Sequence, residues 1–263
     1  MTAPERDAGP AERAFVVATA GHVDHGKSSL VLALTGTDPD RWAEEKARGL
    51  TIDLGFAHFT LDDHPEGPDG AIGVSLVDVP GHVRFLKNML AGVGGVDACL
   101  FVVAATEGWK PQSEEHLRIL QLLGLTRGVI ALTKVDLVDE EWLELARLDV
   151  ADRVDGTFLE AADVIAVDSV RGGGIGELRS ALARMLRGTA TSEDRLRPRL
   201  WVDRSFAAKG AGTVVTGTLT GGSFRVDDTV AIEGRAGRLS SRVRSLQSHG
   251  RSVASVGDRK SVV

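Results

Sequence analysis

The residues with the clearest chemical capacity lie in a glycine-rich loop, residues 21–28, which fits the pattern G-x-x-x-x-G-K-S. Glycines allow backbone amides to turn toward phosphate oxygens, and a helix that begins at the loop adds the positive end of its dipole. In this pattern Lys27 neutralises the β- and γ-phosphates, and the Ser28 hydroxyl is a ligand for Mg²⁺. The spacing predicts a nucleotide phosphate site, with a fortuitous glycine-rich turn as the alternative. The residues expected to line this site are His25, Gly26, Lys27, Ser28 and Ser29.

A second pattern, Asp78-Val79-Pro80-Gly81, stands at the end of an apolar run. A carboxylate at the end of a strand beside a phosphate loop can hold Mg²⁺, usually through water, and a glycine there lets the backbone approach the γ-phosphate. Asp-x-x-Gly is common in turns, so this pattern is informative only because a phosphate loop precedes it. We therefore predict that Asp78 binds the metal and that Gly81 lies at the γ-phosphate.

A third pattern, Thr133-Lys134-Val135-Asp136, follows another apolar run and indicates which base is bound. The Asp136 carboxylate can accept hydrogen bonds from the ring nitrogen and the exocyclic amine of guanine, a donor pair that adenine lacks. This favours GTP and GDP over ATP and argues against an ATP-dependent kinase. For this pattern taken alone, a Lys-Asp pair in a solvated turn is the alternative.

These patterns need a scaffold that brings them to one place. Short apolar runs predict strands at residues 15–20, 73–79, 98–104, 128–133 and 163–167. Amphipathic runs predict helices at residues 27–34, 84–92, 112–123, 140–154 and 175–186. This alternation is typical of an α/β fold with a parallel-rich, doubly wound sheet that carries helices on both faces.

The composition divides the chain into four segments. Residues 1–13 are polar and predict a flexible leader, residues 14–188 carry the α/β pattern, and residues 189–198 form a polar linker that ends in proline. The last segment, residues 199–263, predicts an incomplete antiparallel β-barrel. Its short β-type runs cover residues 200–206, 213–219, 229–233 and 238–245.

The bulk composition is that of an ordinary globular protein of 263 residues, with 43% hydrophobic and 26% charged residues. The net charge of -6 argues against a surface that binds nucleic acid everywhere, so any RNA contact must be regional. The single cysteine, Cys99, lies in an apolar run, which predicts a buried strand residue in a reducing cytosol. No stretch has the roughly 20 apolar residues that cross a membrane. We expect a cytoplasmic monomer without membrane contact.

The order of the motifs resembles the translational GTPases of the elongation factor Tu class. The resemblance rests on the phosphate loop, on residues 44–52 and on residues 78–82, and it extends over nearly the whole chain. It implies that Thr51 is the switch residue that closes over Mg²⁺ and the γ-phosphate, and that His82 orients the attacking water on the ribosome. A histidine next to the γ-phosphate-sensing glycine stands where a water nucleophile must be aligned. A helix-capping surface histidine is the alternative.

Within that class, three segments resemble the selenocysteine-specific elongation factors, namely residues 34–41, 51–57 and 89–97. Thr133 stands where an asparagine that braces the phosphate loop is more usual, which implies weaker nucleotide binding and faster exchange. Asp168-Ser169-Val170 stands where Ser-Ala-x is expected, so Ser169 is a poorly matched base contact. Asp24 is implied to lie by the β- and γ-phosphates, and a turn-stabilising role is its alternative.

In the last segment, Asp203-Arg204 and residues 209–217 resemble the start of the barrel that grips the aminoacyl end of tRNA. In the selenocysteine factors this pocket pairs an Asp-Arg step with a further arginine, which corresponds here to Arg244. A selenol is an anion at neutral pH, so guanidinium groups could select it over the neutral hydroxyl of serine. The alternative is that these arginines are ordinary solvated strand residues.

The resemblance implies a GTP-hydrolysing elongation factor that delivers selenocysteinyl-tRNA to the ribosome, with GTP or GDP and Mg²⁺ as cofactors. Rival functions are a general elongation or initiation factor of the same class, and a regulatory GTP-binding module without tRNA. The family continues with a third barrel and with winged-helix modules that bind a messenger hairpin. Residues 258–263 lack the apolar strand expected next, so we expect a C-terminally truncated chain in which hairpin recognition belongs to absent domains.

Overall fold

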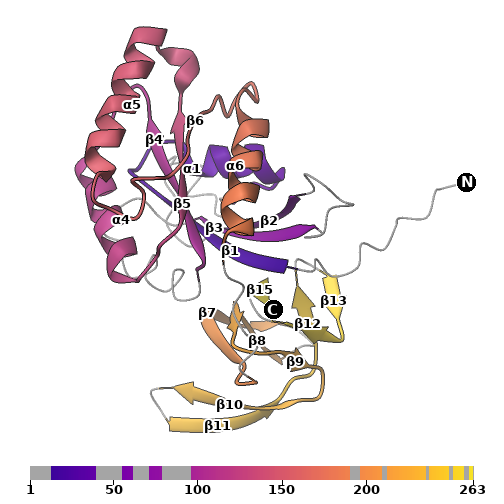
Figure 1. The fold of residues 1–263 in the computed structure, drawn as a ribbon. Coiled ribbons are helices and arrows are strands. Elements are labelled where there is room, and N and C mark those ends of the chain that lie inside the picture. Colours follow the sequence, from indigo (N-terminus) through magenta and orange to yellow (C-terminus); the bar gives the residue numbers. More distant parts are fainter. Residues whose placement is uncertain are drawn as a thin grey trace, which may run out of the picture.

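The computed structural model of the chain describes residues 13–39, 55–61, 71–78, 96–189, 196–208, 212–234, 237–248, 251–257 and 261–262. Within them the larger unit is built on a six-stranded sheet with the order β2-β3-β1-β4-β5-β6 (Figure 1). Its strands are β1 (Arg13–Ala20), β2 (Gly55–Leu61), β3 (Ile72–Asp78), β4 (Ala98–Ala104), β5 (Gly128–Thr133) and β6 (Val164–Ala166). Neighbours pair in parallel, except that β2 is antiparallel to β3. The predicted parallel-rich α/β fold is confirmed.

Helices cover both faces of this sheet (Figure 1). The described helices are α1 (Lys27–Thr35), α4 (Pro111–Leu122), α5 (Glu140–Val154) and α6 (Ile175–Arg187). Residues of α1 and α6 pack in one core with Leu100 of β4, and residues of α4 and α5 pack in a second core with Phe101. Successive strand residues point to opposite faces, so an unbroken apolar run such as β4 is fully buried only when both faces are covered. None of the described helices is long and apolar enough to cross a membrane.

Local sequence signals set the ends of these helices. Gly26 precedes α1 and Gly36 follows it, with left-handed φ angles of 81° and 70° that glycine adopts without strain. Helix α4 begins with Pro111, whose missing N–H is not needed in a first turn. Asp139 caps α5, because its carboxylate accepts a hydrogen bond from the Trp142 amide at 2.8 Å. The start of α1 is therefore fixed where the phosphate pattern requires a helix N-terminus.

The smaller unit contains only strands among its described residues. They are β7 (Arg199–Ala208), β8 (Gly212–Thr220), β9 (Phe224–Arg225), β10 (Thr229–Gly234), β11 (Gly237–Arg242), β12 (Leu246–Ser248), β13 (Arg251–Val253), β14 (Ser255–Val256) and β15 (Ser261–Val262). One sheet has the order β13-β12-β15-β8-β7, and β10 and β11 form a separate antiparallel hairpin. The buried residues of its core are Leu219, Leu246 and Val256. This arrangement agrees with the predicted partial antiparallel barrel.

The sequence patterns and the structure differ at several elements. No apolar pattern predicts β2, because this edge strand is only partly buried and mixes polar with apolar residues. The strand predicted over residues 238–245 ends at Arg242, so Arg244 lies in the connection to β12. Residues 258–263 lack an apolar run, yet β15 lies among them and pairs with β8 and β12 through its backbone. The helix predicted at residues 84–92 lies outside the described residues.

Candidate functional site

The phosphate loop joins β1 to α1 and contains three residues with positive φ angles. These are Gly21 (130°), Asp24 (63°) and Gly26 (81°). A Cβ atom on Gly21 would lie 2.1 Å from the carbonyl oxygen of Val102, so only glycine can approach β4 this closely. Asp24 is exposed, and aspartate is one of the residues that tolerate the left-handed conformation. The loop is thus packed against the carboxyl edge of the sheet, at the N-terminus of a helix, which is a geometry that binds anions.

Lys27 is buried in the first turn of α1, with 6% of its surface exposed. Its Nζ atom donates hydrogen bonds to the carbonyl oxygens of His22 at 2.6 Å and Gly21 at 3.1 Å. A buried ammonium is tolerated only when such partners replace its water. These hydrogen bonds hold the ammonium group against the loop backbone. A bound phosphate could replace the two carbonyl oxygens as the hydrogen-bond acceptor of Lys27. Ser29, two positions further along α1, is exposed.

Asp78, the last residue of β3, is fully buried and accepts two short hydrogen bonds. Thr19 Oγ1 donates to its Oδ1 atom at 2.6 Å, and Ser28 Oγ donates to its Oδ2 atom at 2.8 Å. The structure therefore brings together Ser28 and Asp78, which come from two separate motifs. A carboxylate beside a hydroxyl is a set of hard oxygen donors that suits Mg²⁺. Sequence reasoning missed Thr19, because a threonine inside a strand carries no signal of this role.

Thr133 is the last residue of β5 and the first residue of the predicted guanine-binding motif, residues 133–136. It connects this motif to the phosphate loop. Its Oγ1 atom donates a hydrogen bond of 2.6 Å to the carbonyl oxygen of His25. A hydroxyl has one proton to donate, whereas the amide of the more usual asparagine has two. The brace from Thr133 to the loop is therefore present, with fewer donors than an asparagine would supply. Weaker nucleotide binding as a consequence stays a prediction.

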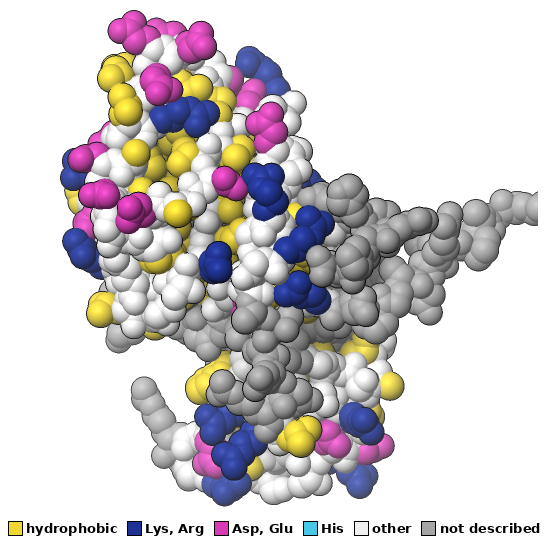
Figure 2. All heavy atoms as spheres, viewed as in Figure 1, with side chains coloured by type: hydrophobic (Ala, Val, Ile, Leu, Met, Phe, Trp, Pro, Cys, Tyr) yellow, Lys and Arg dark blue, Asp and Glu magenta, His cyan; other side chains and the backbone are white. Residues whose placement is uncertain are grey.

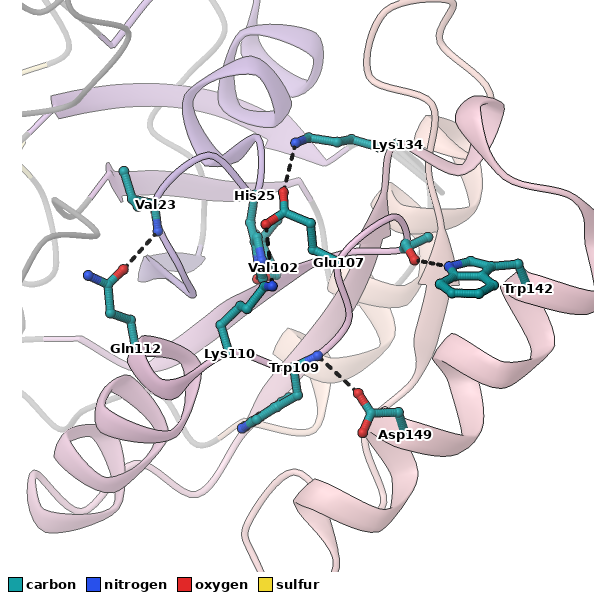
Figure 3. A network of polar contacts seen from close by, with 11 residues as sticks. Val23, His25, Val102, Glu107, Trp109, Lys110, Gln112, Lys134, Trp142 and Asp149 are labelled. Atoms are coloured by element: carbon teal, nitrogen blue, oxygen red, sulfur yellow. Dashed lines mark hydrogen bonds and ion pairs between the residues drawn. The ribbon is translucent and has the colours of Figure 1, made fainter.

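Lys134 and Asp136 follow β5 at the same edge of the sheet. Lys134 has a φ angle of 57°, and its ammonium lies 3.4 Å from the carboxylate of Glu107 (Figure 3). Asp136 lies in a single 3-10 turn, Val135–Leu137, and its side chain is 19% exposed. Parallel strands end at a common edge, so this carboxylate and the phosphate loop lie at the same edge of the sheet.

The turn after β6 departs from the expected pattern. Asp168 is buried, and its Oδ1 atom accepts hydrogen bonds from the amides of Val170 and Arg171, each 2.9 Å long. The hydroxyl oxygen of Ser169 is buried and has no hydrogen-bond partner in the described part of the chain. The Arg171 Nη1 atom lies 3.7 Å from Oδ2 of Asp136. Arg171 thus links this turn to the base-reading carboxylate, and an arginine in a glycine-rich loop gives no sequence signal of such a role.

Helix α4 supplies two further acceptors to the phosphate loop. Gln112 Oε1 accepts a hydrogen bond from the amide of Val23 at 3.2 Å, and His116 Nδ1 accepts one from the amide of Gly21 at 3.0 Å (Figure 3 shows the Gln112 bond). Burial, and then the charge of Lys27, lower the pKa of His116 to about 3, so its Nδ1 atom remains an acceptor. Residues four apart share a helix face. That spacing is the signal that could have revealed this pair.

His25 is part of the phosphate loop, and its side chain is buried (Figure 3). Its Nδ1–H donates to the carbonyl oxygen of Val102 at 3.3 Å, and its ring meets the edge of His22 with 5.0 Å between centroids. Burial lowers the pKa of His25 to about 4 and also lowers the pKa of His22. The imidazoles around the loop are therefore neutral near pH 7, which leaves Lys27 as the cation of the loop.

Four predicted residues lie wholly or in part outside the described part of the chain. Thr51, Gly81 and His82 lie outside the described residues. Asp203 belongs to β7, but its side chain is not among those described. The roles of these four residues stay predictions.

The two candidate arginines of the smaller unit, Arg204 and Arg244, both lie near the β7–β8 hairpin. Arg204 is half-buried on β7, four residues before Ala208, which pairs with Gly212 of β8. A Cβ atom on Gly212 would lie 4.0 Å from the Nη1 atom of Arg244, which is exposed. Arg244 therefore lies near the start of β8 at Gly212, and Arg204 pairs with Thr216 further along the same hairpin.

Comparisons with known proteins agree with this geometry. A family model described as the elongation factor Tu GTP binding domain matches residues 12–188. A selenocysteine-specific elongation factor of Desulfomicrobium baculatum is 46% identical over 249 residues, which cover 94% of this chain and 38% of that protein. The translation initiation factor 2 subunit gamma of Thermococcus kodakarensis is 33% identical over 266 residues, which cover 89% of this chain and 65% of that protein.

A solved structure, that of a bacterial selenocysteine-specific elongation factor, aligns with a TM-score of 0.85 and 36% identity. The alignment covers 95% of this chain and 41% of that one. The present chain therefore spans about two fifths of the length of these two selenocysteine factors. On the family match over residues 12–188, the chain belongs to the elongation factor Tu GTP binding domain family.

Proposed function

We propose that this chain is the GTP-binding and tRNA-contacting part of a selenocysteine-specific elongation factor. In this role it acts as a monomer in the cytoplasm, delivers selenocysteinyl-tRNA to the ribosome, and hydrolyses GTP to GDP and phosphate. The observation that carries the proposal is the junction of Asp78 with Ser28, beside the buried Lys27. Similarity to selenocysteine-specific elongation factors supports the choice of tRNA.

The groups that bind the nucleotide lie at the carboxyl edge of the sheet. The N-terminus of α1 and the loop amides bind the phosphates, and Lys27 exchanges its carbonyl partners for phosphate oxygens. Asp136 accepts two hydrogen bonds from guanine, and adenine would leave that carboxylate unpaired. Lys134 and Ser169 flank the base, and Thr133 braces the loop.

The oxygen atoms around Asp78 fit Mg²⁺, which neutralises charge on the phosphates when it is bound. Ser28 would bind the ion directly and Asp78 through water, with Thr51 added in the GTP state. Gly81 lets the backbone approach the γ-phosphate, and His82 orients the attacking water. His82→Ala is expected to lower ribosome-stimulated hydrolysis at least a hundredfold while GTP binding is retained. Unchanged single-turnover hydrolysis on ribosomes would assign the water to another group.

The base-reading role is tested by Asp136→Asn. This variant should lose about a hundredfold in GDP affinity and gain affinity for xanthosine diphosphate, because the oxygen of xanthine replaces the amine of guanine. Fluorescence titration with labelled nucleotides measures both. Asp155→Asn, on an exposed residue just after α5, is the matched control. If Asp136→Asn still binds GDP in preference to xanthosine diphosphate, Asp136 does not make the proposed contact with guanine.

The tRNA part of the proposal rests on Asp203, Arg204 and Arg244. Both arginines lie near the β7–β8 hairpin, and a guanidinium group there would favour an anionic selenol over the neutral hydroxyl of a seryl ester. We expect Arg204→Ala and Arg244→Ala to reduce the preference for selenocysteinyl-tRNA over seryl-tRNA about fivefold to tenfold, since each removes one charged contact. Competition binding with a non-hydrolysable GTP analogue measures the preference, and Arg238→Ala on the distant β11 is the control. An unchanged preference in both variants would contradict the assignment.

A second candidate is an initiation factor of the same class, which the similarity to initiation factor 2 subunit gamma favours. Initiator tRNA that displaces selenocysteinyl-tRNA in the same competition would support it. A regulatory GTP-binding module would bind GDP and GTP but no tRNA at all. Contact with a messenger hairpin would belong to domains outside the matched region.

A further inference from the structure

The turn after β6 carries a carboxylate in a fixed position. Asp168 is buried, and its Oδ1 atom is occupied by the amides of Val170 and Arg171 at 2.9 Å. Its backbone amide bonds to the carbonyl oxygen of Gly173 at 2.9 Å, and its backbone carbonyl accepts from Gly172 at 2.9 Å. The carboxylate cannot turn without breaking the two hydrogen bonds to its Oδ1 atom. Its second oxygen, Oδ2, therefore keeps one direction.

That second oxygen points to the guanidinium that also serves the base-reading carboxylate. Arg171 Nη1 lies 3.8 Å from Oδ2 of Asp168 and 3.7 Å from Oδ2 of Asp136. Strands β5 and β6 are parallel neighbours, so the turns that follow them meet at one edge of the sheet. Two carboxylates, those of Asp136 and Asp168, and the guanidinium of Arg171 thus lie together at the place where guanine would bind.

Asp136 and Asp168 carry like charges, and the guanidinium of Arg171 offsets their repulsion. Both carboxylates approach one guanidinium nitrogen, at 3.7 Å and 3.8 Å, so two like charges lie near each other at this edge of the sheet. Asp136 must be ionised and correctly oriented to accept two hydrogen bonds from guanine. A serine at position 168 would not create this problem, because its hydroxyl carries no charge. Asp168 thus adds a second negative charge near Asp136, and Arg171 is the cation that both acids approach.

We propose that Arg171 is a positioning residue for guanine recognition, anchored by Asp168 and acting on Asp136. Arg171 offsets the second acid and holds the Asp136 carboxylate toward the base, while its own side chain stays at the surface with 74% exposure. This inference rests on the proposed binding of guanine nucleotides at Asp136. It goes beyond that function, because it assigns the discrimination of guanine from other nucleobases to Asp136, Asp168 and Arg171 together instead of to Asp136 alone.

The test is a double-mutant cycle in the full chain, with Arg171→Ala, Asp168→Ser and the combination. We expect Arg171→Ala to weaken GDP binding about threefold to fivefold, the range of a partly exposed ion pair. In the Asp168→Ser background the same change should have less than half of that effect, because the second acid is gone. Arg171→Lys should retain most of the affinity. The loss should shrink in 1 M salt, which screens surface charges.

A second readout separates positioning from a general loss of structure. Inosine diphosphate lacks the exocyclic amine, so it makes one hydrogen bond fewer to Asp136. Arg171→Ala should lower the ratio of GDP affinity to inosine diphosphate affinity, whereas a merely structural role would weaken both ligands equally. Arg238→Ala is the control, because Arg238 also forms an exposed ion pair, with Glu233 at 3.1 Å, in the distant β10–β11 hairpin.

The outcomes distinguish this inference from the proposed function. Wild-type protein that binds GDP, with equal effects of Arg171→Ala in both backgrounds, overturns the role of Arg171 and leaves guanine binding intact. If Arg171→Ala leaves the ratio of GDP affinity to inosine diphosphate affinity unchanged, the positioning role of Arg171 is likewise overturned and guanine binding remains intact. Folded wild-type protein without measurable affinity for GDP overturns guanine binding and, with it, this inference.

Discussion

In the larger unit, Lys27, Asp78 and Thr133 are buried, and each one hydrogen-bonds to the phosphate loop or to the first turn of α1. In the smaller unit, Arg204 is half-buried and Arg244 is exposed. Charged side chains also gather over the far end of that unit, around β10 and β11 (Figure 2). The candidate nucleotide-binding residues Lys27, Asp78 and Thr133 are thus buried in the fold, whereas the candidate tRNA-binding arginines are half-buried or exposed on its surface.

The cores explain this difference. The sheet of the larger unit has a hydrophobic cluster on each face, whereas the described part of the smaller unit has one cluster around Leu219, Leu246 and Val256. A strand end that is packed from both sides loses its conformational freedom during folding, before any ligand binds. The described side chains of the candidate nucleotide site are therefore held by the fold before a ligand binds, whereas those of the candidate tRNA site are more exposed.

The largest expected effect compares one buried leucine in each unit. Leu100→Ala should destabilise the larger unit by about 4 kcal/mol, because a close-packed core cannot fill the cavity. Leu219→Ala should cost the smaller unit only about 2 kcal/mol, since a thin core can collapse around the gap. Hydrogen exchange at increasing urea concentration, resolved by peptide, measures both. Equal costs would break the comparison.

The next effect concerns acid. The folded larger unit keeps His25 and His116 neutral, with pKa values of about 4 and about 3, against 6.5 when unfolded. Between these values the unfolded chain binds more protons, so stability is complete above pH 6.5 and falls as the pH decreases toward 4. The loss should reach about 3 kcal/mol or more.

The smaller unit has no histidine among its described residues, so it should lose less over the upper part of this range. Unfolding at several pH values, with Trp109 and Trp142 as reporters of one unit and Trp201 of the other, measures the contrast. Equal slopes between pH 6.5 and 5 would show that the buried imidazoles are not its cause.

A smaller effect tests the helix that braces the loop. His116→Leu leaves the amide of Gly21 buried without an acceptor, which should weaken GDP binding about tenfold, or about 1.4 kcal/mol. His116→Asn restores an acceptor near the position of Nδ1 and should lose less. Nucleotide titration and dissociation rates measure both variants. Equal losses in the two variants would mean that packing, and not the hydrogen bond, matters at this position.

The smallest effect is expected on the open side of the smaller unit. Leu239 on β11 is 67% exposed, so Leu239→Ser should change stability by less than about 0.5 kcal/mol. Peptide-resolved hydrogen exchange provides the measurement. A loss above 1 kcal/mol would reveal a buried role for this face and would narrow the contrast between the two units.

The sequence by itself determined the parts whose physics is local. The spacing of Gly21, Gly26 and Lys27 predicted the loop, and apolar runs placed Asp78 and Thr133 at the ends of strands. Steric limits on glycine and the alternation of strand side chains act over a few residues, so they can be read from the chain. The edge strand β2 and the short β15 escaped this reading, because backbone pairing with distant strands defines them.

Only the tertiary structure decided which side chains meet. Thr19 and Asp78 are 59 residues apart in sequence, and Gly21 and His116 are 95 apart, yet both pairs are hydrogen-bonded. The approach of Arg171 to Asp136 likewise depends on two turns that follow parallel neighbours. Such contacts are set by strand order and helix packing, which no local pattern encodes. The sequence therefore predicted a guanine nucleotide site, and the fold decided which neighbours support it.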